Sequence, residues 1–222
     1  MCDIACIDRQ LGTNSIIRTI PNYCVNNRGM DCGDTIANWF NDYLNKTNLR
    51  VIYFYEQQVF FQRDMIAFES YVEQYTKPWD MTTFSDGAPI TVISEKSVYD
   101  LNTRLDEEDK VTDANFRMNL IVKGCAPYTE DSWDVFYIGD QTKIHLWSAC
   151  PRCIAPNVNP VTGTRNKNYQ PRKKLQQYRP GTEFKATLDT NARKFLADWP
   201  LMGTFCGVDV CGTIKVGDAV RG

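Results

Sequence analysis

A Cys-Pro-Arg-Cys tetrapeptide at residues 150–153 combines side chains that could do chemistry. Its two thiols, Cys150 and Cys153, enclose Pro151 and Arg152. A thiolate is a nucleophile and a ligand for soft metals, and a guanidinium binds phosphate or oxo groups through paired hydrogen bonds. Three interpretations are therefore open: a redox pair, half of a zinc site, or one thiolate ligand for a metal that an anionic organic cofactor carries.

The residues after the tetrapeptide disfavour the redox interpretation. In a thioredoxin-like pair the first thiol lies at a helix N-terminus, where the helix dipole favours the thiolate. Here Pro156 and Pro160 follow closely, and a proline inside a helix removes a hydrogen bond and clashes with the preceding turn. We therefore expect no long helix after the pair.

A zinc site would need two more ligands from elsewhere in the chain. Cys206 and Cys211, or the single histidine His145, are the candidates. The spacing of this second cysteine pair is loose, and His145 falls in a strand-like run, where a core or surface histidine is the commoner case. The zinc interpretation stays an alternative.

A basic segment after the tetrapeptide favours the third interpretation. Residues 154–182 contain no aspartate or glutamate. The positive charges of this segment come from Arg165, Lys167, Arg172, Lys173, Lys174 and Arg179. A solvated basic loop gives the same pattern, but a focused site for an anionic ligand explains it too, which neither the redox nor the zinc interpretation does.

The composition narrows the class of protein. The chain has 222 residues and a mass of 25.5 kDa, enough to bury one good core or two small ones. Hydrophobic residues make up 43% of it and charged residues 23%, which is typical of a globular protein. The net charge of -2 argues against general affinity for nucleic acid, because such binding depends on cationic patches.

The nine cysteines bear on the compartment. The first residues do not resemble a secretory signal, and no apolar run approaches the ~18 residues of a membrane span. We therefore expect a soluble chain with free thiols in a reducing, intracellular compartment. Five cysteines lie in or beside apolar stretches and are expected to be small buried hydrophobes: Cys24, Cys32, Cys125, Cys206 and Cys211.

Hydrophobic patterning predicts two elements in the first part of the chain. Apolar residues at helical spacing predict an amphipathic helix over residues 34–46, with Asp31 and Asp34 as candidate caps. A β-branched and aromatic run predicts a buried strand over residues 50–56. Residues 57–79 show a mixed pattern that predicts no element.

A second set of elements follows. Residues 89–93 are typical of a strand, after which Ser94 is expected to cap a helix. The apolar face of this helix consists of Val98, Leu101 and Leu105. The acidic run at residues 106–109 is expected to be a solvated helix end or loop.

The remaining elements are mostly strands. We expect a strand over residues 119–124, a hairpin over residues 133–147 that turns at Gly139-Asp140, a short helix over residues 171–178 that starts with proline, and short strands over residues 203–220. Many short strands with few helices indicate an α+β fold, mostly β and barrel-like.

An ordered series of motifs resembles the MOSC domain. In chain order the series is "FRMNLIVKGCAPYTEDSWDVFYIGD", "CPRC", "NPVTG", "KKLQQYR" and "GTIKVGDAV". The motifs "MDCGDTIANWF" and "ISEKSVYDLNTRL" are similar to the mitochondrial amidoxime-reducing component family within it. The resemblance runs from about residue 30 to residue 220. It implies a MOSC-type barrel with peripheral helices at residues 65–222, preceded at residues 1–64 by the remnant of the MOSC N-terminal domain.

This resemblance implies a molybdenum enzyme. Members of the family bind a molybdenum-pterin cofactor and reduce N-hydroxylated, amidoxime-type substrates with electrons from a small haem protein and its flavin reductase. Full-length relatives are anchored in the mitochondrial outer membrane, whereas this chain shows no anchor segment.

The resemblance also assigns roles to residues. Cys153 falls where the family has its molybdenum ligand and catalytic centre, and Arg152 falls at a cofactor contact. Arg117 and Asn119, in "FRMN", match an Arg-x-Asn motif that holds the pterin. These types are suitable because a pterin phosphate needs cationic and amide donors, and the metal needs one anionic sulfur.

The chain departs from the family at several candidate cofactor contacts. Gly87 and Ala88 precede Pro89 where the family usually has small hydroxyl residues, and Pro151 stands where serine is frequent. Backbone N–H groups at Gly87 and Ala88 can still bind phosphate. An N-terminal lysine-serine pair and an arginine of the family have no counterpart, which implies an incomplete isoform, a truncated gene model or a diverged paralogue.

Two other functions fit the resemblance. MOSC domains also occur with pyridoxal-phosphate desulfurases, where Cys153 would carry sulfur for the cofactor. A non-catalytic binding module is the second, because each missing charge-assisted hydrogen bond would lower cofactor affinity by about 1.5 to 3 kcal/mol.

Overall fold

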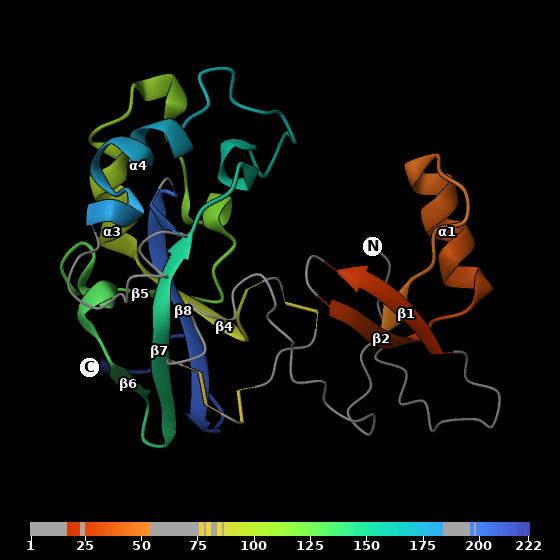
Figure 1. Ribbon diagram of the computed structural model, residues 1–222, viewed down its shortest axis with the longest axis horizontal. Helices are drawn as coiled ribbons and strands as arrows, with labels where there is room; N and C mark the ends of the chain where they lie inside the picture. The colour runs from red at the N-terminus through yellow and green to blue at the C-terminus, as the bar shows by residue number, and fades with distance from the viewer. Residues whose placement is uncertain are drawn as a thin grey trace. The chain divides into compact units, whose positions relative to one another are not determined.

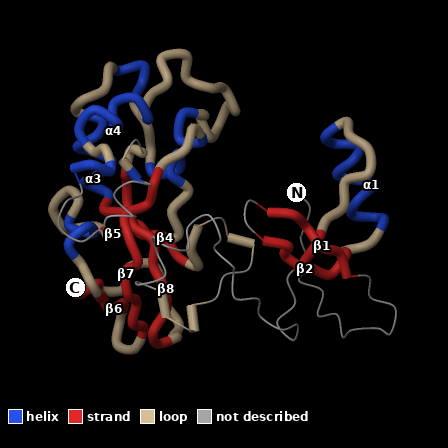
Figure 2. Tube along the Cα trace, viewed as in Figure 1, coloured by secondary structure: helices blue, strands red, loops and turns tan. Residues whose placement is uncertain are grey.

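The structure, a computed structural model, divides into two compact units, Met1–Asp64 and Met65–Gly222. It describes residues 17–22, 25–53, 76–77, 79–80, 84–85, 87–183, 196–197 and 199–222. Figures 1 and 2 show the helices and strands of each unit.

The first unit holds an antiparallel sheet and a helix among its described residues. Strands β1 (Ile17–Asn22), β2 (Val25–Asp31) and β3 (Ile52–Tyr53) pair in the order β1-β2-β3. Helix α1 (Asp34–Leu44) follows β2, which confirms the helix predicted there. Strand β3 is the described part of the strand predicted over residues 50–56, because residues 54–75 lie outside the described ranges. The burial predicted for this strand is wrong for its described residues, since Ile52 is half-buried and Tyr53 is exposed.

Neither Asp31 nor Asp34 is the N-cap of α1, so the cap prediction is wrong. Gly33 occupies the N-cap position, and its N–H donates to Asp31 Oδ1 at 2.8 Å. Arg50 donates from Nε and Nη2 to Asp31, at 2.9 and 2.6 Å, and from Nη1 to Asp34 at 2.6 Å. The two acids therefore join the start of α1 to the segment before β3.

The second unit is built on a six-stranded sheet, which curls into a nearly closed barrel. Its strands are β4 (Ile90–Ser94), β5 (Leu120–Val122), β6 (Val135–Ile138), β7 (Thr142–Pro151), β8 (Leu201–Val210) and β9 (Val220–Arg221). Their order is β5-β4-β8-β7-β6-β9, with β4 and β5 parallel and the other neighbours antiparallel.

In the described part of the second unit, helices α3 (Glu95–Asn102) and α4 (Arg172–Tyr178) lie beside this barrel, and Figure 1 shows them close to each other at one end of it. The α+β prediction, a mostly β barrel with peripheral helices, is confirmed. Among the described residues, none of the helices combines the length and the apolar composition that crossing a membrane requires.

Alternation along β4 divides the core into two clusters, because successive side chains of a strand point to opposite faces. Val92 belongs to a cluster formed by strands, with Val122, Phe136, Ile138, Ile144 and Cys206. Ile93 belongs to a cluster between the sheet and the helices, with Val98, Leu101, Leu105, Phe116, Leu175 and Met202. The second cluster confirms the apolar face predicted for α3, whose cap is Ser94 Oγ accepting from Lys96 N at 3.2 Å.

Strand β8 starts two residues before the short strands predicted over residues 203–220, and it ends near the first break expected between them, at Gly212. It is one strand of 10 residues that pairs with β4 on one side and β7 on the other. Gly203 within it has φ 69°, and a Cβ there would lie 2.7 Å from the carbonyl oxygen of Val92. This glycine permits a close approach to β4 and does not end the strand. The predicted hairpin is confirmed, with Gly139 at φ 59° in its turn.

The prediction of a fully solvated acidic run is wrong at one residue. Asp109 is buried, with 5% of its surface exposed. It accepts hydrogen bonds from the side-chain amides of Asn166, at 2.7 Å, and Asn168, at 3.2 Å. These bonds replace those to water that a buried carboxylate loses, and they attach the basic segment to the rest of the second unit.

Candidate functional site

The Cys-Pro-Arg-Cys tetrapeptide lies at the end of β7, where its two thiols face different surroundings. Cys150 is buried and packs against Ala88, Trp147 and Phe205. Cys153 is exposed, in the loop after the strand. The loop continues as a short 3-10 turn over Ala155–Asn157, so no long helix follows the pair, as its prolines predict. Only the second thiol is presented to a ligand.

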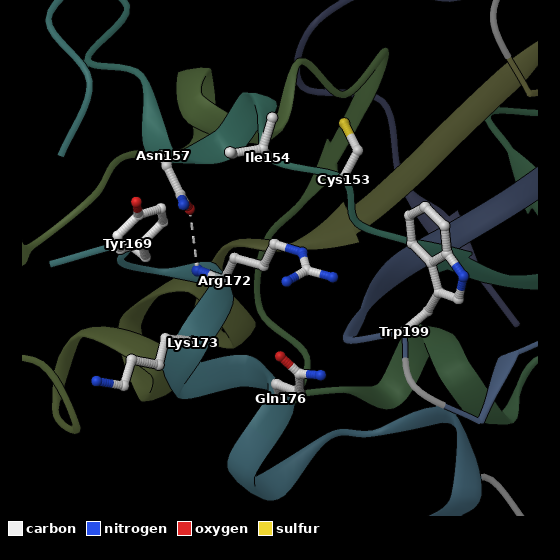
Figure 3. Close-up of a pocket in the computed structure, with 8 residues that line it drawn as sticks. All are labelled: Cys153, Ile154, Asn157, Tyr169, Arg172, Lys173, Gln176 and Trp199. Atoms are coloured by element: carbon white, nitrogen blue, oxygen red, sulfur yellow. Dashed lines mark hydrogen bonds between the residues drawn. The ribbon is translucent and has the colours of Figure 1, made fainter. Parts of the chain in front are cut away.

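Cys153 lines a pocket of about 470 Å³. Its Sγ accepts a hydrogen bond from the N–H of Ala155 at 3.4 Å. The other lining residues are Ile154, Asn157, Tyr169, Arg172, Lys173, Gln176 and Trp199. Figure 3 shows the Arg172 guanidinium extending into the space that Cys153, Gln176 and Trp199 surround. The pocket therefore brings one thiol, two cations and aromatic rings together.

Arg152, the residue before Cys153, is buried, with 8% of its surface exposed. Its Nε donates to the carbonyl oxygen of Met202 at 2.8 Å, and its Nη1 donates to that of Phe116 at 3.1 Å. Its Nη2 lies 2.8 Å from Met118 Sδ. These contacts join the residue before Cys153 to β8 and to the 3-10 turn Asp113–Phe116. The cofactor contact that the resemblance implies for Arg152 stays a prediction.

Arg117 and Asn119 lie just before the first residue of β5. Arg117 is exposed and has φ 53°, a left-handed conformation. Asn119 Oδ1 accepts from both the N–H and the hydroxyl of Thr91, each at 2.9 Å, and its own N–H donates to Thr91 Oγ1 at 3.2 Å. The Asn119 side chain therefore couples β5 to β4, with its carbonyl oxygen already occupied.

Gly87 and Ala88 lie close to residues of β8 and β7. A Cβ at Gly87 would lie 2.3 Å from Cζ of Phe205, so the aromatic ring leaves no room for the hydroxyl side chain that the family usually has. Ala88 and Cys150 share one buried cluster, and Pro151 is half-buried opposite Leu201 in the β7–β8 register. The fold thus brings together candidate residues that are about sixty positions apart in sequence.

Sequence reasoning placed Arg172 and Lys173 in the basic segment but not in the site, and it missed Asn157 and Trp199. Asn157 is buried, and its Oδ1 accepts the N–H of Arg172 at 3.1 Å. Its Nδ2 is buried without an acceptor among the described residues. The absence of acidic residues from residues 154–182 was the sequence signal for these cations, but it does not indicate which of the six lie on the same pocket.

Two of the residues considered for a zinc site, His145 and Cys206, are buried, whereas Cys211 is exposed. His145 is buried in β7, with Nε2 2.9 Å from Asp80 Oδ2 and Nδ1 2.9 Å from Asp209 Oδ1. Cys206 is buried, and burial raises the pKa of its thiol to about 12. Both ring nitrogens thus face carboxylates, and the Cys206 thiol resists the deprotonation that zinc ligation needs.

The cysteine predictions hold in part. Cys206 is buried as expected, Cys32 and Cys125 are half-buried, and Cys211 is exposed, so the prediction for Cys211 is wrong. Cys211 follows the last residue of β8, where the chain leaves the sheet. Cys24 lies outside the described residues.

Comparison with known proteins identifies similar chains. A family model described as "MOSC domain" matches residues 80–221. The chain is 35% identical over 192 residues to human mitochondrial amidoxime-reducing component 1, an alignment that covers 86% of this chain and 52% of that protein. It is 34% identical over 194 residues to mitochondrial amidoxime reducing component 2 of Rattus norvegicus, covering 87% of this chain and 53% of that protein.

A third relative is mitochondrial amidoxime reducing component 2 of Bos taurus, 33% identical over 193 residues, with 87% of this chain and 52% of that protein covered. The chain therefore spans about half the length of the curated relatives it matches.

Proposed function

The chain belongs to the MOSC domain family, and from this premise we propose that it binds a molybdenum-pterin cofactor and reduces N-hydroxylated, amidoxime-type compounds. The observation that carries the proposal is the exposure of Cys153 on a pocket with two cations, while its neighbour Cys150 is buried. The names of the relatives, amidoxime-reducing components, support the reaction class. Residues 65–222 would be the MOSC domain, and residues 1–64 part of the MOSC N-terminal domain.

The described side chains fit such a cofactor. A thiolate that is presented alone suits a soft metal whose other ligands come from an organic group. Arg172 and Lys173 give the same pocket a positive charge, which suits anionic ligands near the thiolate. In the described part of the chain, no group of three or more histidine, cysteine, aspartate or glutamate side chains could hold a metal ion by itself.

Each candidate residue would have a distinct task. Cys153 would bind the metal as a thiolate and release its proton to solvent, because its thiol is exposed. Arg117 and the Asn119 Nδ2 would donate to the pterin, and the backbone N–H groups of Gly87 and Ala88 would donate to its phosphate.

Arg152 would hold Cys153, the next residue, in position. Its hydrogen bonds to Phe116 and Met202 hold the chain beside the ligand cysteine, and rigid support of this kind preserves ligand geometry. Pro151, paired opposite Leu201, restricts the same loop.

The cofactor, when bound, would supply two electrons for cleavage of an N–O bond, which together with two protons yields the N–H compound and water. Trp199 would orient a planar substrate by stacking. A small haem protein and its flavin reductase would be the electron donors, and the names of the relatives favour a mitochondrial site of action.

Cofactor content tests the proposal directly. Molybdenum and pterin would be measured in the purified full chain, in Cys153→Ala and in Cys150→Ala. The wild type and Cys150→Ala should contain both at similar levels, and Cys153→Ala should lose most of the molybdenum. Equal molybdenum in all three proteins would remove Cys153 as a ligand, and a wild type without molybdenum would contradict the proposed function.

The exposed Cys153 thiol also suits the second candidate, sulfur transfer from a pyridoxal-phosphate desulfurase. Incubation with such an enzyme and its cysteine substrate, followed by mass spectrometry, would detect a persulfide. A persulfide on Cys153 in a chain that contains no molybdenum would favour this candidate over the reductase.

A further inference from the structure

The described lining of the pocket beside Cys153 carries positive charge only. Among the described residues that line it, Arg172 and Lys173 are the charged side chains, and none is an aspartate or a glutamate. Among the described residues, neither cation forms a salt bridge. Seven other lysines and arginines do: Arg50, Lys77, Arg104, Lys110, Lys123, Lys143 and Arg179. The two pocket cations therefore lack a described internal counter-ion.

A buried side chain holds the backbone of Arg172 in place. Arg172 is half-buried, and its backbone N–H donates to Oδ1 of the buried Asn157 at 3.1 Å. That hydrogen bond fixes the side-chain amide of Asn157, whose Nδ2 has no acceptor in the described part of the chain. The wall of the pocket at Arg172 thus has more donors than acceptors, which is the arrangement that an anion satisfies.

Aromatic rings form other parts of the lining. Trp199 is half-buried, and Figure 3 shows its indole beside the space into which Arg172 extends. Tyr169 is exposed, and the Arg165 guanidinium lies over its ring at 5.0 Å from the centroid. A planar carbon skeleton can stack on such rings while its charged end meets the cations.

We propose that Arg172 and Lys173 recognise the anionic group of a planar, N-hydroxylated substrate, such as a carboxylate, whose N–O end lies toward Cys153. The inference rests on the proposed function, because it takes the pocket as the substrate side of a reductase. The same chemistry, a planar ring with an anion, could come from the pterin cofactor and its phosphate, and the experiment separates these two sources.

The experiment compares two probes, benzamidoxime and 4-carboxybenzamidoxime, by calorimetric titration of the full chain without an electron donor. Molybdenum and pterin are measured in the same samples. The variants are Arg172→Gln, Lys173→Gln and Arg172→Lys. Lys174→Gln is the matched control, since this lysine is next to Lys173 on α4 and does not line the pocket.

The wild type should bind the carboxylate probe at least tenfold more tightly than the neutral probe. Arg172→Gln and Lys173→Gln should each weaken binding of the carboxylate probe by about tenfold, the effect of losing one charge-assisted hydrogen bond. Neither variant should change binding of benzamidoxime. Arg172→Lys should restore part of the preference, and Lys174→Gln should retain all of it.

Two results would overturn the proposal. The first is equal binding of both probes by wild type and variants. The second is a loss of pterin from Arg172→Gln and Lys173→Gln, which would make the cofactor phosphate the anion. A wild type that lacks molybdenum but prefers the carboxylate probe would contradict the proposed function and support the recognition of anions by this pocket.

Discussion

Arg152 Nε donates a 2.8 Å hydrogen bond to the carbonyl oxygen of Met202, which lies 50 positions later in the chain. The same guanidinium binds the carbonyl oxygen of Phe116, 36 positions earlier. One buried cation thus joins three distant segments immediately beside the candidate ligand Cys153. Its loss would leave two buried acceptors without donors, and this is costly because neither can reach water.

We expect Arg152→Gln to lower the free energy of unfolding by about 3 kcal/mol, since two charge-assisted hydrogen bonds are lost or weakened. Urea unfolding followed by circular dichroism would measure it. Arg165→Gln, an exposed arginine, is the control and should change stability by less than about 0.5 kcal/mol. Unchanged stability of Arg152→Gln together with loss of cofactor would instead make Arg152 a direct contact.

Thiol modification should separate the cysteines by their burial. Iodoacetamide at pH 8 should alkylate Cys153 and Cys211, which are exposed, and should spare Cys150 and Cys206. Burial raises the pKa of Cys206 to about 12, so almost none of its thiolate is present at pH 8. Peptide mass spectrometry would report the modified sites, and the denatured chain is the control in which all should react. Comparable labelling of Cys150 and Cys153 would contradict the described β7.

The contact between Gly87 and Phe205 predicts that substitutions at these two residues have coupled effects on the free energy of unfolding. Gly87→Ala should destabilise the chain by about 1 to 3 kcal/mol, because the new Cβ meets a buried ring that cannot move aside freely. In a Phe205→Leu background the same substitution should cost less, since the ring atom at 2.3 Å is gone. Thermal or urea unfolding of the four proteins completes a double-mutant cycle. Additive effects would mean that the two residues do not touch.

Asp131 predicts a dependence of stability on pH. Burial raises its pKa to about 6, despite Arg179 Nη2 at 2.7 Å from its Oδ2. The folded chain then binds more protons than the unfolded chain between pH ~4 and pH ~6. This contribution to stability is full below pH ~4 and is lost as the pH rises through about 6.

Asp131→Asn does not titrate and serves as the reference. The unfolding free energy of the wild type minus that of Asp131→Asn should fall when urea unfolding is repeated from pH 4 to pH 7. A difference that increases over this range would show that the ion pair with Arg179 outweighs burial.

Local signals predicted much of the fold. The helical spacing before residue 46, the serine at Ser94 and the turn at Gly139-Asp140 each specify an element through nearby residues alone. The start of strand β8 could not be predicted in this way, because the predicted strand begins at Gly203, which lies inside β8 as a close contact in the sheet.

The sequence indicated only the centre of the candidate site. The family resemblance singled out Cys153, but which thiol faces the core depends on the β7–β8 register, which shifts between Leu146 and Ser148 and between Ala149 and Pro151. A shift of one residue moves every side chain to the opposite face. The pocket also depends on Asn157 and Trp199, which come from separate segments and meet only in the folded chain.

Asp109 holds the basic segment through the neutral amides of Asn166 and Asn168 and not through any of its cations. The shape of this loop and its charge are therefore set by different side chains. Exchange of the lysines and arginines around the pocket would leave these two hydrogen bonds in place. The anion preference proposed for the pocket would thus be free to change, in evolution or by design, without loss of the loop that carries it.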